Sequence, residues 1–230
     1  MEECNLAVFD LDGTLTRHDT LVPFIAGFLW RHPWRLWRLA RCLAPLLRYG
    51  AGPRDRAALK SIVIQHTLGG VASAPLTRWA DRFTARLLHA GLYAEALECI
   101  SAHRRAQDYL VLLSASPNLY VPVIAQALGF DECICTEVHW RSDGTLDGRL
   151  SSANRRGAEK ARCVNTLLAE HHPLLSYAYG NSPADLEHLQ LVSAGTYVNG
   201  SPAALVNLPN VRAVRWSRPG AVTFAPPATI

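Results

Sequence analysis

The sequence predicts an α/β protein: a Rossmann-like, doubly wound parallel sheet with a helical cap inserted after its first strand. Short apolar runs alternate with helix-patterned segments in residues 1–16 and 106–230, which is typical of parallel strands joined by crossover helices. Residues 17–105 instead show helix-spaced apolar positions separated by Gly or Pro. We therefore expect a core formed by residues 1–16 and 106–230 and a cap formed by residues 17–105.

The elements of the predicted core follow from its apolar runs and from the turn residues between them. Helices are expected to begin near Asn118, Gly157, Pro183 and Pro202. The predicted strands are Leu6–Phe9, Tyr109–Leu113, Ser176–Tyr179, Thr196–Val198 and Val211–Val214.

The predicted cap is helical and strongly basic. Between Arg17 and Arg105 there are 14 Lys and Arg residues against 5 Asp and Glu residues, whereas the rest of the chain has 9 against 14. The two parts therefore differ in charge as well as in pattern. The helices expected in the cap span residues 21–29, 33–47, 54–67, 75–90 and 94–105.

Composition narrows the class of protein further. The chain has 230 residues, of which 49% are hydrophobic and 18% charged, as is typical of globular proteins that bury a core. The longest uncharged stretch, residues 109–130, has Ser, Asn and Pro in its middle, so it indicates a strand, a turn and a helix rather than a membrane span. The acidic N-terminus is unlike a secretory signal, and the six cysteines form no CxxC pair, so we expect a cytoplasmic protein with reduced thiols.

Polar residues follow three of the predicted strands, at the point where each strand ends. They are the segments DLDGT at residues 10–14, SAS at 114–116 and GNSPAD at 180–185. Because the carboxyl ends of neighbouring parallel strands line one crevice, we expect these segments to meet. Two carboxylates followed by Gly and Thr suit a divalent cation together with a phosphate. Taken alone, the first segment would also fit a turn and a helix cap.

These segments resemble the motifs of a known family. Phe9–Leu15, with the letters FDLDGTL, matches the first motif of the haloacid dehalogenase superfamily, whose members are mostly phosphatases with an aspartate nucleophile. Leu110–Ser114 looks like the second motif, Gly157–Lys160 like the third and Gly180–Asp185 like the fourth, all in the family's order. A helical insertion directly after the first motif is similar to the phosphoserine phosphatase-like branch.

The same branch has a small β-hairpin that acts as a flap. Ile134–Trp140 and Thr145–Leu150 fit this hairpin, because Asp143-Gly144 between them is a strong turn signal. The resemblance therefore covers nearly the whole chain.

The resemblance implies a role for each motif residue. Asp10 would be the nucleophile, and Asp12 would protonate the departing alcohol and later accept a proton from water. Lys160 would neutralise charge on the nucleophile and the phosphate. The chain has only two Lys against 21 Arg, and a compact point charge at residue 160 suits this role better than a guanidinium. The groups expected to hold the phosphate are Gly13, Thr14, Ser114, Ala115 and Lys160.

The resemblance also implies a Mg²⁺ site made by Asp10, the backbone carbonyl of Asp12, Asn181 and Asp185. At Asn181 the branch usually has Asp, so a neutral amide replaces one carboxylate. An amide oxygen is still a ligand for a hard cation, but the site loses one negative charge. The alternative to a working phosphatase is therefore a catalytically impaired relative that binds a phosphorylated ligand or an anionic membrane surface.

The substrate depends on the cap and is left open between a small phosphorylated metabolite and a phospholipid headgroup. Asp19 stands where phosphoserine phosphatases use Glu to hold the substrate amine, and Lys60 lies near their Arg for the substrate carboxylate. Both are candidate substrate contacts by resemblance, and both also fit ordinary surface charges.

The cap contains an unusual stretch rich in Trp and Arg, residues 30–41. On a helix starting at Pro33, Trp34 and Trp37 share one stripe, Arg35 and Arg38 a second, and Leu residues a third. This pattern suits peripheral contact with an anionic membrane. The alternative is a cap helix that packs its Leu residues on neighbours and leaves its Arg residues in solvent. A nucleic-acid partner is not expected, because net charge is only +4 and no binding motif accompanies the patch.

Overall fold

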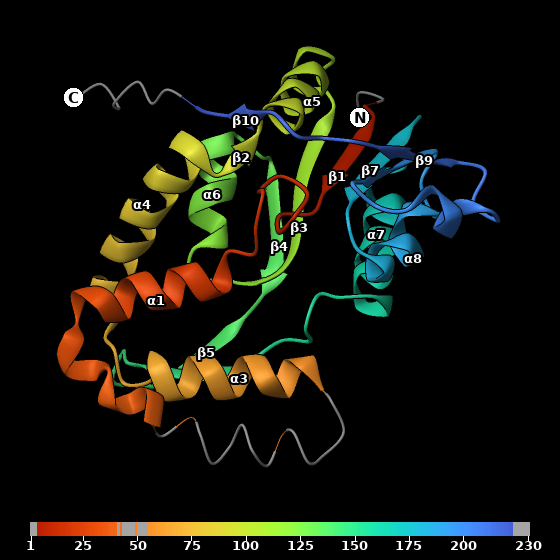
Figure 1. The fold of residues 1–230 in the computed structure, drawn as a ribbon. Helices are drawn as coiled ribbons and strands as arrows, with labels where there is room; N and C mark the ends of the chain where they lie inside the picture. The colour runs from red at the N-terminus through yellow and green to blue at the C-terminus, as the bar shows by residue number, and fades with distance from the viewer. Residues whose placement is uncertain (1–3, 41, 43–48, 50–54, 223–230) are drawn as a thin grey trace.

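A computed structural model describes residues 4–40, 42, 49 and 55–222. Its centre is a six-stranded parallel sheet with the strand order β4-β3-β1-β7-β8-β9 (Figure 1). The order reverses at β1, which lies between β3 and β7, so the predicted doubly wound sheet is confirmed. The strands are β1 (Leu6–Phe9), β3 (Tyr109–Pro117), β4 (Glu132–Thr136), β7 (Ser176–Gly180), β8 (Ala194–Val198) and β9 (Val211–Val214).

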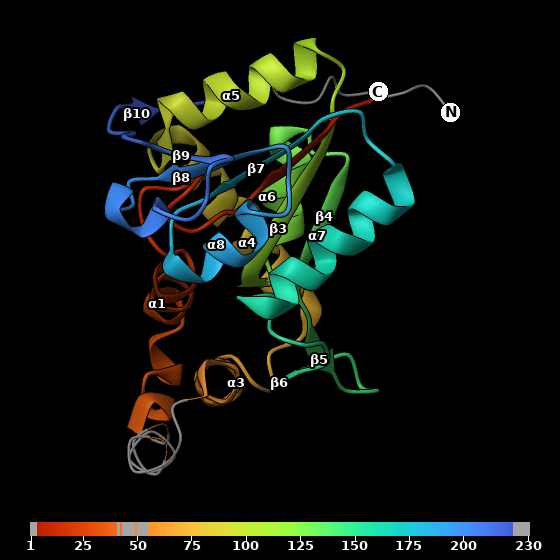
Figure 2. The ribbon, with the colours of Figure 1, turned by 90° about the vertical axis from the view of Figure 1, so that its right-hand side faces the viewer.

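Alternate residues of β1 face two separate hydrophobic layers, as expected for a strand buried on both sides. Leu6 and Val8 pack with α7 (Ala158–His171) and α8 (Leu186–Leu189). Ala7 and Phe9 pack with α5 (Ala94–Arg105) and α6 (Val121–Leu128) on the opposite face (Figure 2).

The segment between β1 and α5 forms the helical insertion. It contains α1 (Leu21–Arg31), the 3₁₀ turn η1 (Pro33–Arg35), α3 (Arg56–Thr67) and α4 (Ser73–Ala90). Helices α1 and α4 meet closely at Gly27, where a Cβ atom would lie 2.6 Å from the Trp79 ring. The Trp79 indole also donates a hydrogen bond of 2.9 Å to the carbonyl of Phe24.

Helix α5 belongs to the predicted cap segment but packs on the sheet. His103 on α5 contacts the Phe9 ring and is hydrogen-bonded to Asp108 and to the Tyr179 hydroxyl at 2.6 and 2.7 Å. Helix α5 therefore forms part of the layer that covers β1 and β7. The division at residues 16/17 and 105/106 remains a prediction.

The predicted hairpin is present but begins later than expected. Residues 134–136 belong to β4, which pairs in parallel with β3 at the edge of the main sheet. The hairpin consists of β5 (Val138–Trp140) and β6 (Leu146–Leu150), which pair antiparallel under α3. The prediction of one strand over residues 134–140 was wrong because an apolar alternation does not show where a strand changes partners.

The predicted helix over residues 33–47 also differs. Residues 33–35 form a 3₁₀ turn and a helix resumes at residues 37–40, while most of residues 41–47 lie outside the described part of the chain. The helices expected near Pro183 and Pro202 begin there as the 3₁₀ turns η2 (Pro183–Asp185) and η3 (Pro202–Leu205). Short elements that the patterns did not indicate are β2 (Leu92–Tyr93) and β10 (Pro219–Gly220). All six cysteines are free thiols. In the described residues, no helix has the length and apolar character needed to cross a membrane.

Candidate active site

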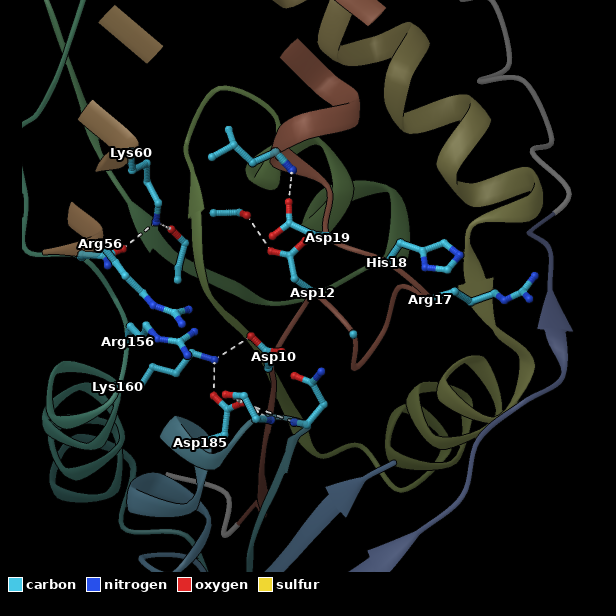
Figure 3. A pocket seen from close by; sticks show the side chains of 17 residues that line it. Asp10, Asp12, Arg17, His18, Asp19, Arg56, Lys60, Arg156, Lys160 and Asp185 are labelled. Carbon is cyan, nitrogen blue, oxygen red and sulfur yellow. Dashed lines mark hydrogen bonds and ion pairs between the residues drawn. The ribbon is translucent and has the colours of Figure 1, made fainter. Parts of the chain in front are cut away.

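The three polar strand ends meet at one cavity of about 480 Å³, at the carboxyl edge of the sheet where the strand order reverses (Figure 3). Core residues line one side and residues of the insertion line the other. The lining includes Asp10, Asp12, Gly13, Arg17, His18, Asp19, Arg56, Lys60, Ala115, Ser116, Asn154, Arg156, Lys160, Asn181, Ser182 and Asp185.

Asp10 follows the last residue of β1 and is buried at the bottom of this cavity. One carboxylate oxygen accepts a hydrogen bond from Lys160 Nζ at 2.6 Å, and the other accepts one from the Thr14 hydroxyl at 2.8 Å. Burial raises the pKa of Asp10 to about 6, although the Lys160 ammonium opposes this shift. Both oxygens are therefore fixed, and the carboxylate is ionised at neutral pH.

Lys160 lies between two carboxylates. Its ammonium, buried in the first turn of α7, also donates to Asp185 at 2.8 Å. Burial lowers the pKa of Lys160, but the two carboxylates outweigh it and raise the pKa overall. The ammonium is therefore charged, as the predicted neutralising role requires.

Asp185 closes a tight turn after β7. Its second oxygen accepts hydrogen bonds from the backbone N–H of Asn181 and Ser182 and from the Ser182 hydroxyl, at 3.2, 2.9 and 2.7 Å. This is a capping box at the start of η2. Burial raises the pKa of Asp185, but Lys160 and these hydrogen bonds hold it well below its usual range. Both Asp185 oxygens therefore have partners within the protein, as both Asp10 oxygens do, and the role of Asp185 as a metal ligand stays a prediction.

Asp12 is held by the insertion as well as by the core. One oxygen accepts from the backbone N–H and the hydroxyl of Thr20, at 2.7 and 2.6 Å, and the other accepts from the Ser116 hydroxyl at 2.6 Å. Tyr120 completes the network through a 2.9 Å bond to the Thr20 hydroxyl. Burial raises the pKa of Asp12, a direction that suits the acid–base role predicted for this residue.

Gly13 and Asn181 fit together closely. Gly13 has a φ of +81°, and a Cβ atom there would lie 2.1 Å from the Asn181 amide nitrogen. Only glycine permits both this backbone conformation and this approach. The Asn181 amide therefore lies directly against the loop that carries Asp10 and Asp12.

Two residues predicted to hold phosphate are placed differently from that expectation. Thr14 is buried, with its hydroxyl on Asp10 and its backbone N–H on the Leu11 carbonyl at 3.3 Å, so it supports the nucleophile. Ser114 is also fully buried and accepts a 3.0 Å hydrogen bond from the Ser116 backbone. Gly13, Ala115 and Lys160 do line the cavity, as predicted.

The two candidate substrate residues have partners within the protein. Asp19 accepts a 3.0 Å hydrogen bond from the Leu21 backbone at the start of α1, so it closes a local turn at the rim of the cavity. Lys60 donates to the Ala115 carbonyl and, at 2.6 Å, to the Asn154 side chain. Whether either residue also contacts substrate stays a prediction.

Several residues of the site were missed by the sequence analysis. Arg56 and Arg156 point into the cavity beside Lys60, whereas Arg17 and His18 lie on the other side of Asp12 (Figure 3). For Arg17 and Arg56 the only signal was the basic excess of the cap, which does not show which guanidinium reaches the site. Arg156 lies in the core, four residues before Lys160, and was the sequence's alternative to Lys160 for the cation beside Asp10; the structure places Lys160 there. Ser116 had a better signal, because it lies two residues after Ser114 at a strand end.

The structure offers oxygen ligands for a small divalent cation, although not a carboxylate cluster. No group of three or more His, Cys, Asp or Glu side chains placed to hold a metal ion occurs within residues 4–40, 42, 49 and 55–222. Asp10, Asp12 and Asn181 all line the cavity, and carboxylate, carbonyl and amide oxygens are donors that fit Mg²⁺.

Comparisons with known proteins agree with this geometry. The model of the haloacid dehalogenase-like hydrolase family matches residues 7–190. Protein CicA of Caulobacter vibrioides is 30% identical over 200 residues, covering 86% of this chain and 88% of that protein. A probable phosphatase of Mycobacterium tuberculosis is 34% identical over 110 residues, or 47% of this chain and 38% of that protein. The structure of a probable phosphoserine phosphatase from Vibrio cholerae superposes with a TM-score of 0.68 at 16% identity, covering 94% of this chain and 61% of that one.

Proposed function

This chain belongs to the haloacid dehalogenase-like hydrolase family, and we propose that it is a Mg²⁺-dependent phosphomonoesterase that works through a phosphoryl-aspartate on Asp10. The observation that supports this best is the buried trio of Asp10, Lys160 and Asp185 at the switch point of the sheet. A carboxylate held by an ammonium at the base of a cationic cavity is suited to attack on a phosphate.

In the first step an Asp10 carboxylate oxygen attacks phosphorus. The bond from phosphorus to the ester oxygen breaks as the new bond forms, and Asp12 gives its proton to the departing alkoxide. Thr14 and Lys160 fix the two Asp10 oxygens, which limits the carboxylate to a narrow range of orientations. Such positioning lowers the barrier because little motion remains to be lost on reaching the transition state.

In the second step water attacks the phosphoryl-aspartate. Asp12, now ionised, accepts a proton from this water, and the bond between phosphorus and the Asp10 oxygen breaks. Inorganic phosphate is released and Asp10 returns to a carboxylate. Thr20 and Ser116 hold Asp12 in place through both steps.

Asp10, the carbonyl of Asp12 and Asn181 are the residues that would hold Mg²⁺. When bound, Mg²⁺ withdraws charge from the transferring phosphoryl group. The substrate is a small phosphorylated compound, and the cationic wall formed by Arg56, Lys60 and Arg156 favours an anionic one. The location that we propose for the enzyme is the cytoplasm.

A phosphatase screen with purified protein tests this proposal. The protein is incubated with phosphoserine, sugar phosphates or lysophosphatidic acid, with and without Mg²⁺, and released phosphate is measured. Metal-dependent release from at least one monoester is expected. Binding of these compounds without any release would instead favour the impaired relative that the sequence left as an alternative.

We also propose that the outer end of the insertion, residues 30–39, contacts an anionic membrane surface. Trp30, Trp34 and Trp37 are 82%, 66% and 60% exposed, and Leu36 and Leu39 are also exposed. The sequence left open an alternative in which the Leu side chains pack on neighbours and the Arg side chains stay in solvent. The structure has the opposite arrangement, with Leu exposed and two Arg side chains bonded to the protein. Arg35 and Arg38 donate to the carbonyls of Gly69 and His66, at 2.8 and 3.2 Å. Exposed Trp and Leu with Arg close by is the composition of an interfacial surface.

Sedimentation with vesicles tests the membrane proposal. Wild type should sediment with vesicles of phosphatidylglycerol and phosphatidylcholine and less with phosphatidylcholine alone. The variant with Ser at residues 30, 34 and 37 should stay in solution. Equal binding by the variant and wild type would exclude this surface as the contact.

A further inference from the structure

Lys60 joins the insertion to two separate segments of the core. It lies on α3, and its ammonium donates to the carbonyl oxygen of Ala115, just after the predicted phosphate-binding serine, and to Asn154 at 2.6 Å. Asn154 belongs to the loop that leads into α7, the helix that carries Lys160. One cap side chain therefore contacts both the end of β3 and the loop before α7.

The Ala115 carbonyl and the Ser116 N–H belong to the same peptide group, and both form hydrogen bonds. The N–H of this peptide, on Ser116, donates to the Ser114 hydroxyl at 3.0 Å. The Ser116 side chain donates to Asp12 at 2.6 Å. A donor on the carbonyl of a peptide polarises its N–H, so hydrogen bonds in such a chain strengthen one another.

We propose that Lys60 is a positioning residue, through which the closed cap fixes the Ala115–Ser116 peptide and hence the Ser114 hydroxyl and the Asp12 carboxylate. This inference rests on the proposed phosphatase function. It gives Lys60 a role that does not require contact with the reacting atoms. Without the Lys60 ammonium the Ala115 carbonyl loses its charged donor, and the peptide at the end of β3 is held only by the Ser116 hydrogen bonds to Ser114 and Asp12. The site therefore depends on α3 lying against the core.

The surroundings of Lys60 make its charge sensitive to pH. Burial lowers the pKa of Lys60 to about 8, with Arg156 and Lys160 acting in the same direction and Asp12 and Asp19 against it. Arg56, another cation, lies one turn earlier on the same helix. As pH rises through this value the ammonium loses its charge, and its hydrogen bond to the Ala115 carbonyl weakens.

Lys60→Met and Arg56→Met form a matched pair that tests the proposal. Each removes one positive charge from the same wall of the cavity, but only Lys60 bonds to Ala115. With p-nitrophenyl phosphate and saturating Mg²⁺, Lys60→Met should lower kcat by about 10- to 100-fold, as small misplacements in active sites do, with KM little changed. Arg56→Met should act mainly on KM. Lys60→Arg should restore most of kcat and move the alkaline limb of the pH profile to higher pH.

Hydrogen exchange on the 114–118 segment provides a readout that does not depend on activity. Exchange should be faster in Lys60→Met than in wild type and unchanged in Arg56→Met, at equal melting temperatures. Equal kcat losses in the two Met variants, or unchanged exchange in Lys60→Met, would overturn the proposal. Failure of wild type to release phosphate would count against the proposed function alone, because exchange would still report on Lys60.

Discussion

The cavity at the sheet edge and the outer end of the insertion depart in opposite directions from the usual distribution of residues. At the cavity, Asp10, Lys160 and Asp185 are charged groups buried against one another. At the outer end, Trp30 and Trp34 are large apolar groups with most of their surface exposed. Buried charge and exposed apolar surface are the two exceptions that carry information about function. The two departures are the basis of the two proposals, chemistry at the cavity and membrane contact at the outer end.

Loss of Asp10 should have the largest effect, because Asp10 is the proposed nucleophile on which the covalent intermediate forms. Asp10→Asn should lower phosphatase turnover by about 10⁴-fold or more, as removal of a nucleophile does elsewhere. Circular dichroism should show an intact fold. Asp143→Asn, in the exposed hairpin turn, is the control and should keep full activity. Substantial turnover by Asp10→Asn would contradict the assignment of Asp10 as the nucleophile and of this cavity as the active site.

Asn181→Asp should sharpen the account of the metal site. Residue 181 lies against Gly13, in the loop that carries Asp10 and Asp12. A carboxylate there adds a negative charge to the proposed metal site, so the half-saturating Mg²⁺ concentration should fall by about tenfold. Without metal, repulsion from Asp10 should lower the melting temperature, and Mg²⁺ should reverse this difference. A metal titration of rate and paired melts provide the measurements. Identical titrations for the two proteins would show that residue 181 does not contact the ion.

Thr14→Val separates support of the nucleophile from binding of phosphate. The substitution keeps the shape of the side chain but leaves one Asp10 oxygen without its donor, which should cost about 1–3 kcal/mol of unfolding free energy. Urea denaturation measures this cost. A variant as stable as wild type, with a raised KM only, would instead favour the phosphate-binding role that the sequence predicted.

Trp34→Ser should have the smallest effect on stability, within about 0.5 kcal/mol, because little of the protein covers this side chain. Phe24→Ala on the buried face of α1 is the contrast and should cost about 3–5 kcal/mol. Thermal melts of both variants give the comparison directly. A large loss in Trp34→Ser would mean that the outer end is packed in solution and is not a free contact surface.

The sequence predicted the core well and the insertion less well, for a physical reason. Strand β1 and the polar segments after β1, β3 and β7 follow from local alternation and turn residues, which act within a few positions. The orientation of Arg35 and Arg38 depends instead on carbonyls exposed at the end of α3, some thirty residues later along the chain. Periodicity contains no information about such partners.

The same distinction holds within the site. Asp10, Asp12 and Lys160 were identified because motif letters state them directly. The bonds from Thr20 to Asp12 and from Lys60 to Ala115 arise only when the insertion folds onto the core, and the bond from Ser116 to Asp12 only when β3 pairs beside β1. The hydrogen bonds of Thr14 to Asp10 and of Asp185 to Lys160 were likewise not evident from the motif letters, and the predicted roles of these two residues in binding phosphate and metal stay predictions.

The most direct test of the central claim is capture of the phosphorylated enzyme. Wild type is mixed with p-nitrophenyl phosphate and Mg²⁺, quenched in acid within the first turnovers, and its peptides are examined by mass spectrometry. The account predicts a phosphoryl group on the peptide that contains Asp10, absent from Asp10→Asn and from samples prepared with a chelator. Turnover without any phosphorylated peptide, or with the phosphoryl group on another residue, would contradict it.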